Sequence, residues 1–378
     1  MTSLNGSESS RAPANDELEV SIFGPGYGET ILVHLGFGDW LIVDSCIDRN
    51  TRLPTSISYL RKLGINPGSA VKIILASHWH DDHVRGLASV FEECELAEFF
   101  CSPSLLNKEF LQLVRAVGTH SIDPGVQEFA KIINFLTNRI TSGRKEAKGP
   151  RWALENTRIW QRNHPSFPAE IFALSPSSAS LTLSFNEISQ LIPTAGQQKR
   201  RVVALTPNHA AVVLCVIVGS QSIILGSDLE ETTDQATGWS VIVDSTARPN
   251  GKAQVFKIPH HGSANGHYDR VWSEMLDDAP FVVLTPFING GVALPTKQDV
   301  HRIGQWTPNA FSTSQLRITQ QKRRRGALDR TIKDVVRSIR TIPNTPGQVR
   351  LRKSLSNAGD SWGVELIDGA VKLSEAVI

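Results

Sequence analysis

The chain has 378 residues, 40% hydrophobic and 20% charged, a composition typical of a globular protein that buries a full core. Its net charge of +2 is too small to indicate a nucleic-acid partner, so any basic surface must be local. No run of 18 apolar residues is present, which argues against a helix that spans a membrane, and the four scattered cysteines form no CxxC pair. We therefore expect a cytoplasmic protein without a membrane partner.

The first elements are a polar leader and three short strands. Residues 1–16 are rich in Ser, Asn and Glu, and we expect them to be disordered. Three apolar stretches, 18–24, 29–35 and 39–45, are separated by the turn sequences PGYG and GFG. This pattern predicts a β-meander whose third strand ends on Asp44.

The next segment alternates helices with strands. SISYLRKLG (56–64) predicts a short helix that ends at a glycine, and VKIILAS (71–77) predicts a buried strand. A helix over 83–93 and a strand over 96–102 follow. This order of elements is typical of α/β proteins.

The middle of the chain, residues 103–175, mixes helical patterns with a basic loop, and we interpret it as a helical insertion. Strand patterns then return. A second group of strands with helices outside both groups predicts two sheets packed face to face. The predicted strands of this second group are ASLTLSF (179–185), AAVVLCVIVG (210–219), SIILGSD (222–228), AQVFKIP (253–259) and FVVLTPF (281–287).

The last segment, residues 311–378, is predicted to be a basic C-terminal extension that follows a main domain over 17–310. Its first part, QKRRRGALDRTIKDVVRSIR (321–340), predicts a basic helix. Its last part, SWGVELIDGAVKL (361–373), alternates apolar and polar residues and predicts a hairpin.

The sequence SHWHDDH (77–83) gathers three of the eleven histidines directly after a predicted buried strand. His78 and His80 are two positions apart, so they can point the same way and share one ion. Asp82 and His83 begin the next turn and could face a second position. Imidazole and carboxylate are ligands of zinc and of neighbouring metals. The alternative, that all three are ordinary surface or core histidines, is weakened by the two adjacent acids.

Further residues of the types that bind metals lie next to predicted strands later in the chain. Asp228 ends the strand of IILGSDLE, and VFKIPHHGS ends a strand on His260 and His261. His209 precedes a strand, and a surface histidine is the alternative interpretation there. Because sites in α/β folds collect where strands end, these segments can converge on one sheet edge.

These motifs together resemble the metallo-β-lactamase fold superfamily over roughly residues 18–305. Within it, GPGYGETILV, LIVDS, LGSDLE and KIPHHGS resemble the hydrolase domain of competence DNA-uptake channel proteins and its free-standing relatives. The resemblance implies an αββα sandwich that holds two divalent metal ions, usually zinc and sometimes manganese. It does not identify a substrate, because this fold serves many chemistries.

The resemblance also implies roles for individual residues. The uptake-channel branch often has a residue other than histidine at the position of His209, and the sequence does not choose between His260 and His261. Asp44 is expected to orient a ligand histidine. The implied metal ligands are His78, His80 and His209 for the first ion, Asp82, His83 and His260 or His261 for the second, and Asp228 as the bridge between the ions.

A two-metal centre implies hydrolysis by a hydroxide that the ions hold, since a metal lowers the pKa of bound water from 15.7 to about 7. Asp82 could aim that hydroxide. Ser263 could contact an anionic oxygen of the substrate, and His267 could give a proton to the leaving group. For His267, an exposed loop histidine is the alternative interpretation.

Local basic runs favour a phosphodiesterase or nuclease that acts on DNA or RNA. They lie at 142–152, 197–201 and 321–326, and Arg323, Arg324 and Arg325 are the expected contacts to the nucleic-acid backbone. Each run can equally be a solvated surface. The alternatives are a hydrolase of a lactone, thioester, phosphoester or cyclic nucleotide, and a metal-dependent sensor without activity. A protein partner is possible but cannot be read from the sequence.

Overall fold

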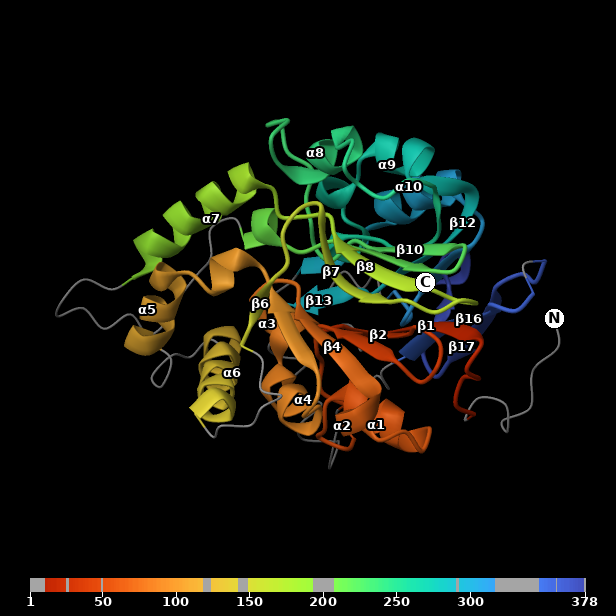
Figure 1. Ribbon diagram of the computed structural model, residues 1–378. Coiled ribbons are helices and arrows are strands. Elements are labelled where there is room, and N and C mark those ends of the chain that lie inside the picture. Colours follow the sequence, from red (N-terminus) through yellow and green to blue (C-terminus); the bar gives the residue numbers. More distant parts are fainter. Residues whose placement is uncertain are drawn as a thin grey trace, which may run out of the picture.

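The computed structural model describes residues 11–24, 27–48, 50–117, 124–141, 149–192, 207–289, 292–316, 347–357 and 359–376. Two eight-stranded sheets lie face to face, and helices cover the outer side of each sheet (Figure 1). The αββα sandwich expected from the sequence is therefore confirmed. Among the described residues no helix combines the length and the apolar character that crossing a membrane requires.

The first sheet carries the predicted β-meander as β1, β2 and β3, which pair antiparallel. From β3 to β6 its strands run parallel. In sheet order, its strands are β17 (Gly363–Ile367), β16 (Gly347–Ser354), β1 (Glu17–Gly24), β2 (Thr30–His34), β3 (Trp40–Val43), β4 (Val71–Ala76), β5 (Glu98–Cys101) and β6 (Arg151–Trp152).

The second sheet has a parallel centre formed by β10, β11, β12 and β15. A separate antiparallel pair, β13 (Phe287–Asn289) and β14 (Val292–Leu294), follows β12 in the chain. In sheet order, the strands of the second sheet are β18 (Val371–Lys372), β15 (Ala310–Ser312), β12 (Leu276–Leu284), β11 (Ala253–Lys257), β10 (Gln221–Leu225), β9 (Leu214–Val218), β8 (Ala169–Ala173) and β7 (Thr157–Arg162).

The helices form the two outer layers. On the side of the first sheet lie α1 (Thr55–Lys62), α2 (Pro67–Ala70), α3 (Asp81–Val84), α4 (Leu87–Glu93), α5 (Lys108–Val117) and α6 (Pro124–Thr141). The helices α8 (Gly238–Asp244), α9 (Asp269–Glu274) and α10 (Lys297–Trp306) cover the second sheet, and α7 (Ser178–Leu191) lies beside α5.

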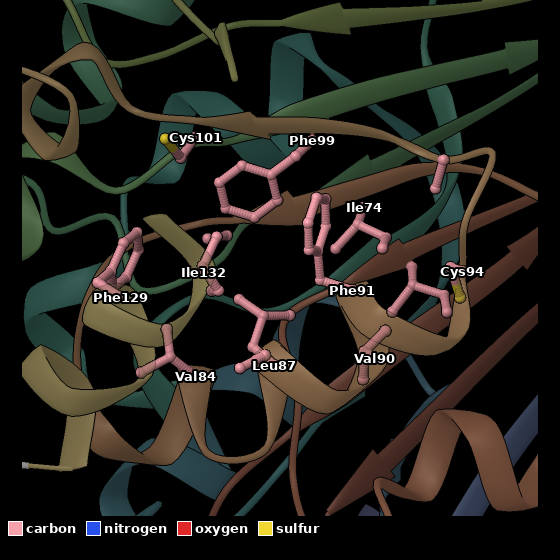
Figure 2. Packing of buried hydrophobic residues seen from close by; sticks show 14 of the residues in the cluster. Ile74, Val84, Leu87, Val90, Phe91, Cys94, Phe99, Cys101, Phe129 and Ile132 are labelled. Carbon is pink, nitrogen blue, oxygen red and sulfur yellow. The ribbon is translucent and has the colours of Figure 1, made fainter. Parts of the chain in front are cut away.

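Three apolar clusters hold these layers together. One lies between the sheets and joins side chains such as Val20 of β1 to Leu214 of β9. Another packs the second sheet against α8, α9 and α10. In the third, between the first sheet and its helices, Phe91 of α4 meets Phe99 of β5 and Ile132 of α6 (Figure 2). Burial on both faces explains why β4 is apolar at nearly every position.

The strand predicted over 179–185 is wrong, because these residues belong to α7. The alternation of Leu181 and Leu183 suggested a strand, but Leu181 is buried together with Ile188, seven positions away, as on one side of a helix. Ser177 starts the helix by accepting a hydrogen bond from the backbone N–H of Ser180.

The hairpin predicted over 361–373 is also wrong. Its first strand, β17, pairs with β16 in the first sheet, whereas β18 pairs with β15 in the second. The segment assigned to a C-terminal extension thus contributes strands to both sheets, and the segment assigned to a helical insertion supplies β7 and β8. Residues 1–10 of the expected leader and the basic helix expected over 321–340 lie outside the described residues.

The cluster in Figure 2 predicts a large loss of stability for Phe91→Ala. Phe91 is 1% exposed and packs edge-on against Phe99. Its truncation should lower the free energy of unfolding by about 3–5 kcal/mol, measured by denaturant titration. Leu96, 55% exposed, is the matched control, and Leu96→Ala should leave the midpoint nearly unchanged. Equal effects of the two changes would contradict this packing.

Candidate metal centre

The metal-ligand types found in the sequence converge where parallel strands of both sheets end. Asp44 follows β3, and the SHWHDDH segment follows β4 in the first sheet. Asp228 and His261 follow β10 and β11 in the second sheet. Because the sheets face each other, their strand ends supply two halves of one centre.

Four buried side chains form the core of this centre: Asp82, His83, Asp228 and His261. Each offers one ligand atom, and these atoms all lie within 4.8 Å of one another. The Nε2 atom of His83 is 3.3 Å from Asp228 Oδ2, and the Nε2 atom of His261 is 3.3 Å from Asp82 Oδ2. An imidazole and carboxylate set of this size can hold a zinc or similar divalent ion.

The outer nitrogens of both histidines are held by hydrogen bonds. His83 Nδ1 lies 2.7 Å from Asp44 Oδ2, and His261 Nδ1 lies 2.8 Å from the backbone oxygen of Thr285. Asp44 is fixed in turn by the backbone N–H and the hydroxyl of Ser77, at 2.7 and 2.6 Å. Both Nδ1 atoms therefore carry the proton, and both Nε2 atoms point inward.

Those inner nitrogens are buried, and neither forms a hydrogen bond of acceptable geometry. A buried polar atom without a partner is costly, and a metal ion would satisfy both nitrogens at once. The donors present thus fit a divalent metal ion.

The charges at the centre also fit a cation. The carboxyl groups of Glu29, Asp44, Asp82 and Asp228 are buried there, and among the described residues of the centre one buried lysine, Lys257, opposes them. Burial alone would raise the pKa of Asp82 and Asp228, but the nearby His83 holds the pKa of both carboxyls below the usual value. Apart from the histidines, four buried acids stand against one buried lysine, and a divalent ion would offset this excess of acidic groups.

The same buried carboxyl groups raise the pKa values of His83 and His261. Burial disfavours the protonated form of His83, but the charges of Asp228 and Glu29 outweigh it and raise the pKa of His83 well above the usual value. The pKa of His261 is raised for the same reason, chiefly by Asp228. A metal ion at the centre would take the place of these protons.

The backbone around the centre is held in uncommon conformations. Asp44, Ser227, His260 and His261 all have positive φ angles, between 45° and 59°, although none is glycine. Such conformations cost about 1–3 kcal/mol each and cluster at functional sites, where the surrounding structure imposes them. At His261 the left-handed turn brings the ring into the centre.

The turn at His260 and His261 separates the two rings. His261 is 2% exposed and lies in the centre. His260 points elsewhere, with its Nδ1 atom 2.8 Å from Asn265 Oδ1 and 3.3 Å from Glu230 Oε1. The structure therefore brings one histidine of the pair to the other ligand-type residues.

His78 and His80 lie beside the four-residue group. His78 Nε2 is 3.2 Å from His80 Nδ1, and the ring centroids of His78 and His83 are 4.2 Å apart. His209 lies in the short 3-10 helix Pro207–Ala210, where its buried Nδ1 has no partner. Among the described residues, His78, His80 and His209 join no compact group of three or more ligand types.

The two residues expected to assist catalysis have different surroundings. Ser263 is half-buried at the C-terminal end of the turn that carries His261. His267 has both ring nitrogens engaged, Nε2 with Asp269 Oδ1 at 2.7 Å and Nδ1 as acceptor from Trp272 Nε1 at 3.1 Å. Its ring thus packs among aromatic side chains with no nitrogen left for the centre.

Sequence reasoning missed Glu29 and Lys257. Glu29 follows Gly28, whose φ of 96° and close approach to Cys46 leave no room for a side chain. Lys257 ends the buried strand β11 and is fully buried itself. A lysine inside the apolar run VFKIP was the available signal, because a charged residue in a buried strand needs a partner.

No protein family model matches the chain, and no curated protein matches it. Solved structures similar to it include the metallo-β-lactamase fold protein YhfI from Bacillus subtilis, with 11% identity, 64% of this chain and 70% of that chain covered, and a TM-score of 0.32. The subclass B3 metallo-β-lactamase MEM-A1 from a soil metagenome library is 12% identical, with 67% of this chain and 80% of that chain covered and a TM-score of 0.33. Zn(2+)-bound PqqB from Methylobacterium extorquens is 10% identical, with 63% of this chain and 71% of that chain covered and a TM-score of 0.30.

At such low identities and TM-scores, these similarities carry no weight for the chemistry of this chain. The resemblance to the competence-channel hydrolase domain stays a prediction.

The geometry of the histidine pair gives a matched test of the centre. His261→Ala removes an inward-pointing nitrogen and should abolish tight metal binding, whereas His260→Ala should retain it. Elemental analysis after metal reconstitution and desalting measures both. Metal loss in the His260 variant, or retention in the His261 variant, would contradict the arrangement described.

Proposed function

We propose that the protein is a metal-dependent hydrolase. The observation that carries this proposal is the buried group of Asp82, His83, Asp228 and His261, in which the two inward nitrogens lie 3.3 Å from carboxylate oxygens without forming a hydrogen bond. A bound divalent metal would supply an activated water at neutral pH by lowering its pKa to about 7. Zinc and manganese both fit imidazole and carboxylate donors.

The chain's own residues would prepare this centre. Asp44 fixes the ring orientation of His83, and the Thr285 carbonyl does the same for His261. Asp82 has the most exposed side chain of the four-residue group, 10% against 4% or less for the others. For the first ion we propose His78 and His80, with Asp82, His83 and His261 on the second. Both histidines follow β4 just before Asp82, the ring of His78 lies against that of His83, and His80 contacts His78.

For the substrate we propose a phosphodiester of DNA or RNA. Residues 322–353 contain eleven Lys or Arg against two acids. Two of these cations are committed inside the fold, since Arg350 pairs with Glu365 and Arg352 with Glu19. The support therefore comes from the other basic residues, Arg323, Arg324 and Arg325 among them. Trp152, 64% exposed on β6, offers a face for base stacking.

We place this hydrolase in the cytoplasm. All four cysteines are buried as free thiols, in keeping with a reducing compartment.

The activity is tested with metal-reconstituted protein on labelled single- and double-stranded DNA and RNA, beside a generic phosphodiester, a lactone, a thioester and a cyclic nucleotide. We expect metal-dependent cleavage of nucleic acid and about two ions per chain. Asp228→Ala should lower the rate by orders of magnitude while circular dichroism stays unchanged. If only a small substrate is turned over, the protein is a small-molecule hydrolase and not a nuclease. Metal binding without any turnover would indicate a sensor.

A nucleic-acid substrate also predicts a role for the basic segment. Replacing Arg323, Arg324 and Arg325 with alanine should weaken binding and flatten its salt dependence by up to about one unit of slope per lost phosphate contact. Turnover of a small phosphodiester should be unaffected, because the metal centre is unaltered. Equal affinity and salt slope for the wild type and the triple variant would remove this segment from the mechanism.

A further inference from the structure

A buried ion pair links the two sheets beside the metal centre. Lys257 Nζ lies 2.7 Å from Glu29 Oε1, and both side chains are fully buried. Glu29 directly precedes β2 of the first sheet, and Lys257 is the last residue of β11 in the second. The pair therefore spans the boundary between the halves of the centre.

On the side of the second sheet, the pair contacts the residues that hold Asp228 and His261. Lys257 Nζ donates to the backbone oxygen of Ser227 at 2.8 Å and lies 3.6 Å from Asp228 Oδ1. Glu29 Oε2 accepts a hydrogen bond from the hydroxyl of Thr285. The backbone oxygen of the same threonine holds the ring of His261.

On the side of the first sheet, Glu29 reaches the other two members of the four-residue group. Its backbone N–H donates to the backbone oxygen of Asp82 at 2.9 Å. Its Oε1 atom lies 3.7 Å from His83 Nδ1. Through direct or one-step contacts, this single pair is thus connected to all four candidate ligands.

The cost of burying such a pair requires a reason other than stability. Removing two charges from water costs several kcal/mol per ion, and apolar side chains of similar volume are often as stable or more stable. We propose that Glu29 and Lys257 form a clamp, as positioning residues, that fixes the spacing between Asp82 and His83 on one sheet and Asp228 and His261 on the other. The clamp rests on the metal centre of the proposed function.

Charge alone and the clamp predict opposite effects for Lys257→Met. Removing the ammonium makes the centre more negative, so charge alone predicts tighter binding of a divalent cation. The clamp predicts weaker binding, because the two halves of the centre lose their fixed spacing. The double variant Lys257→Met with Glu29→Gln removes one positive and one negative charge, so its net charge equals that of the wild type.

The experiment measures the affinity for Zn²⁺ by competition with a chelator and the visible absorption of the Co²⁺-loaded protein. For both Lys257→Met and the double variant we expect affinity to fall by about 10–100-fold, as when other groups that orient metal ligands are lost. We also expect the Co²⁺ bands to shift, which general destabilisation of a well-folded protein would not cause.

A second buried pair provides the matched control. Arg352 and Glu19 lie 2.7 Å apart, 7% and 0% exposed, and join β16 to β1 within the first sheet. Arg352→Met with Glu19→Gln removes the same charges away from the centre. This control should retain wild-type affinity and Co²⁺ bands even if its melting temperature falls.

Each other outcome overturns the clamp. A folded double variant with wild-type affinity and spectrum shows that spacing does not depend on the pair, and tighter binding in Lys257→Met shows that charge dominates. If the double variant fails to fold while the control folds, the pair serves the fold and not the centre. Wild-type protein that binds no metal would overturn the proposed function itself, and the clamp with it.

Discussion

Negative charge buried where the two sheets meet is the constraint on which the rest of the site depends. Carboxylates from both sheets approach one another out of contact with bulk water, where their repulsion is weakly screened. Protons on His83 and His261, the ammonium of Lys257 and, in the proposed holoprotein, a metal ion are the means of offsetting it.

The same constraint explains why the surrounding backbone is so closely specified. A small displacement of the His83 or His261 ring would move its Nε2 atom away from the position of a metal ion. The Nδ1 atom of each ring is therefore fixed by a hydrogen bond, to Asp44 for His83 and to the Thr285 carbonyl for His261. The positive φ angles at Asp44 and His261 show that the fold accepts local strain to keep these directions.

The sequence predicted the sandwich and the meander. It also predicted that Asp82, His83, Asp228 and one histidine of the 260–261 pair converge, because strand periodicity and ligand types are local signals. It grouped His78, His80 and His209 with them, and these three join no compact group among the described residues. It did not distinguish His260 from His261, since that choice is made by a left-handed turn that no residue pattern reveals. Nor could it find Glu29 and Lys257, which meet only after the sheets pack. The strand predicted at 179–185 failed because short apolar alternation fits a half-exposed helix equally well.

The place of β16 between β17 and β1 has a consequence for how the protein is made. Glu19 and Arg352, which pair across these strands, are 333 positions apart in the chain. As the ribosome releases the polypeptide, one hydrogen-bonding edge of β1 therefore stays open until the residues of β16 have emerged. During that interval the nascent sheet presents the open edge of an apolar strand, with which any extended segment nearby can pair.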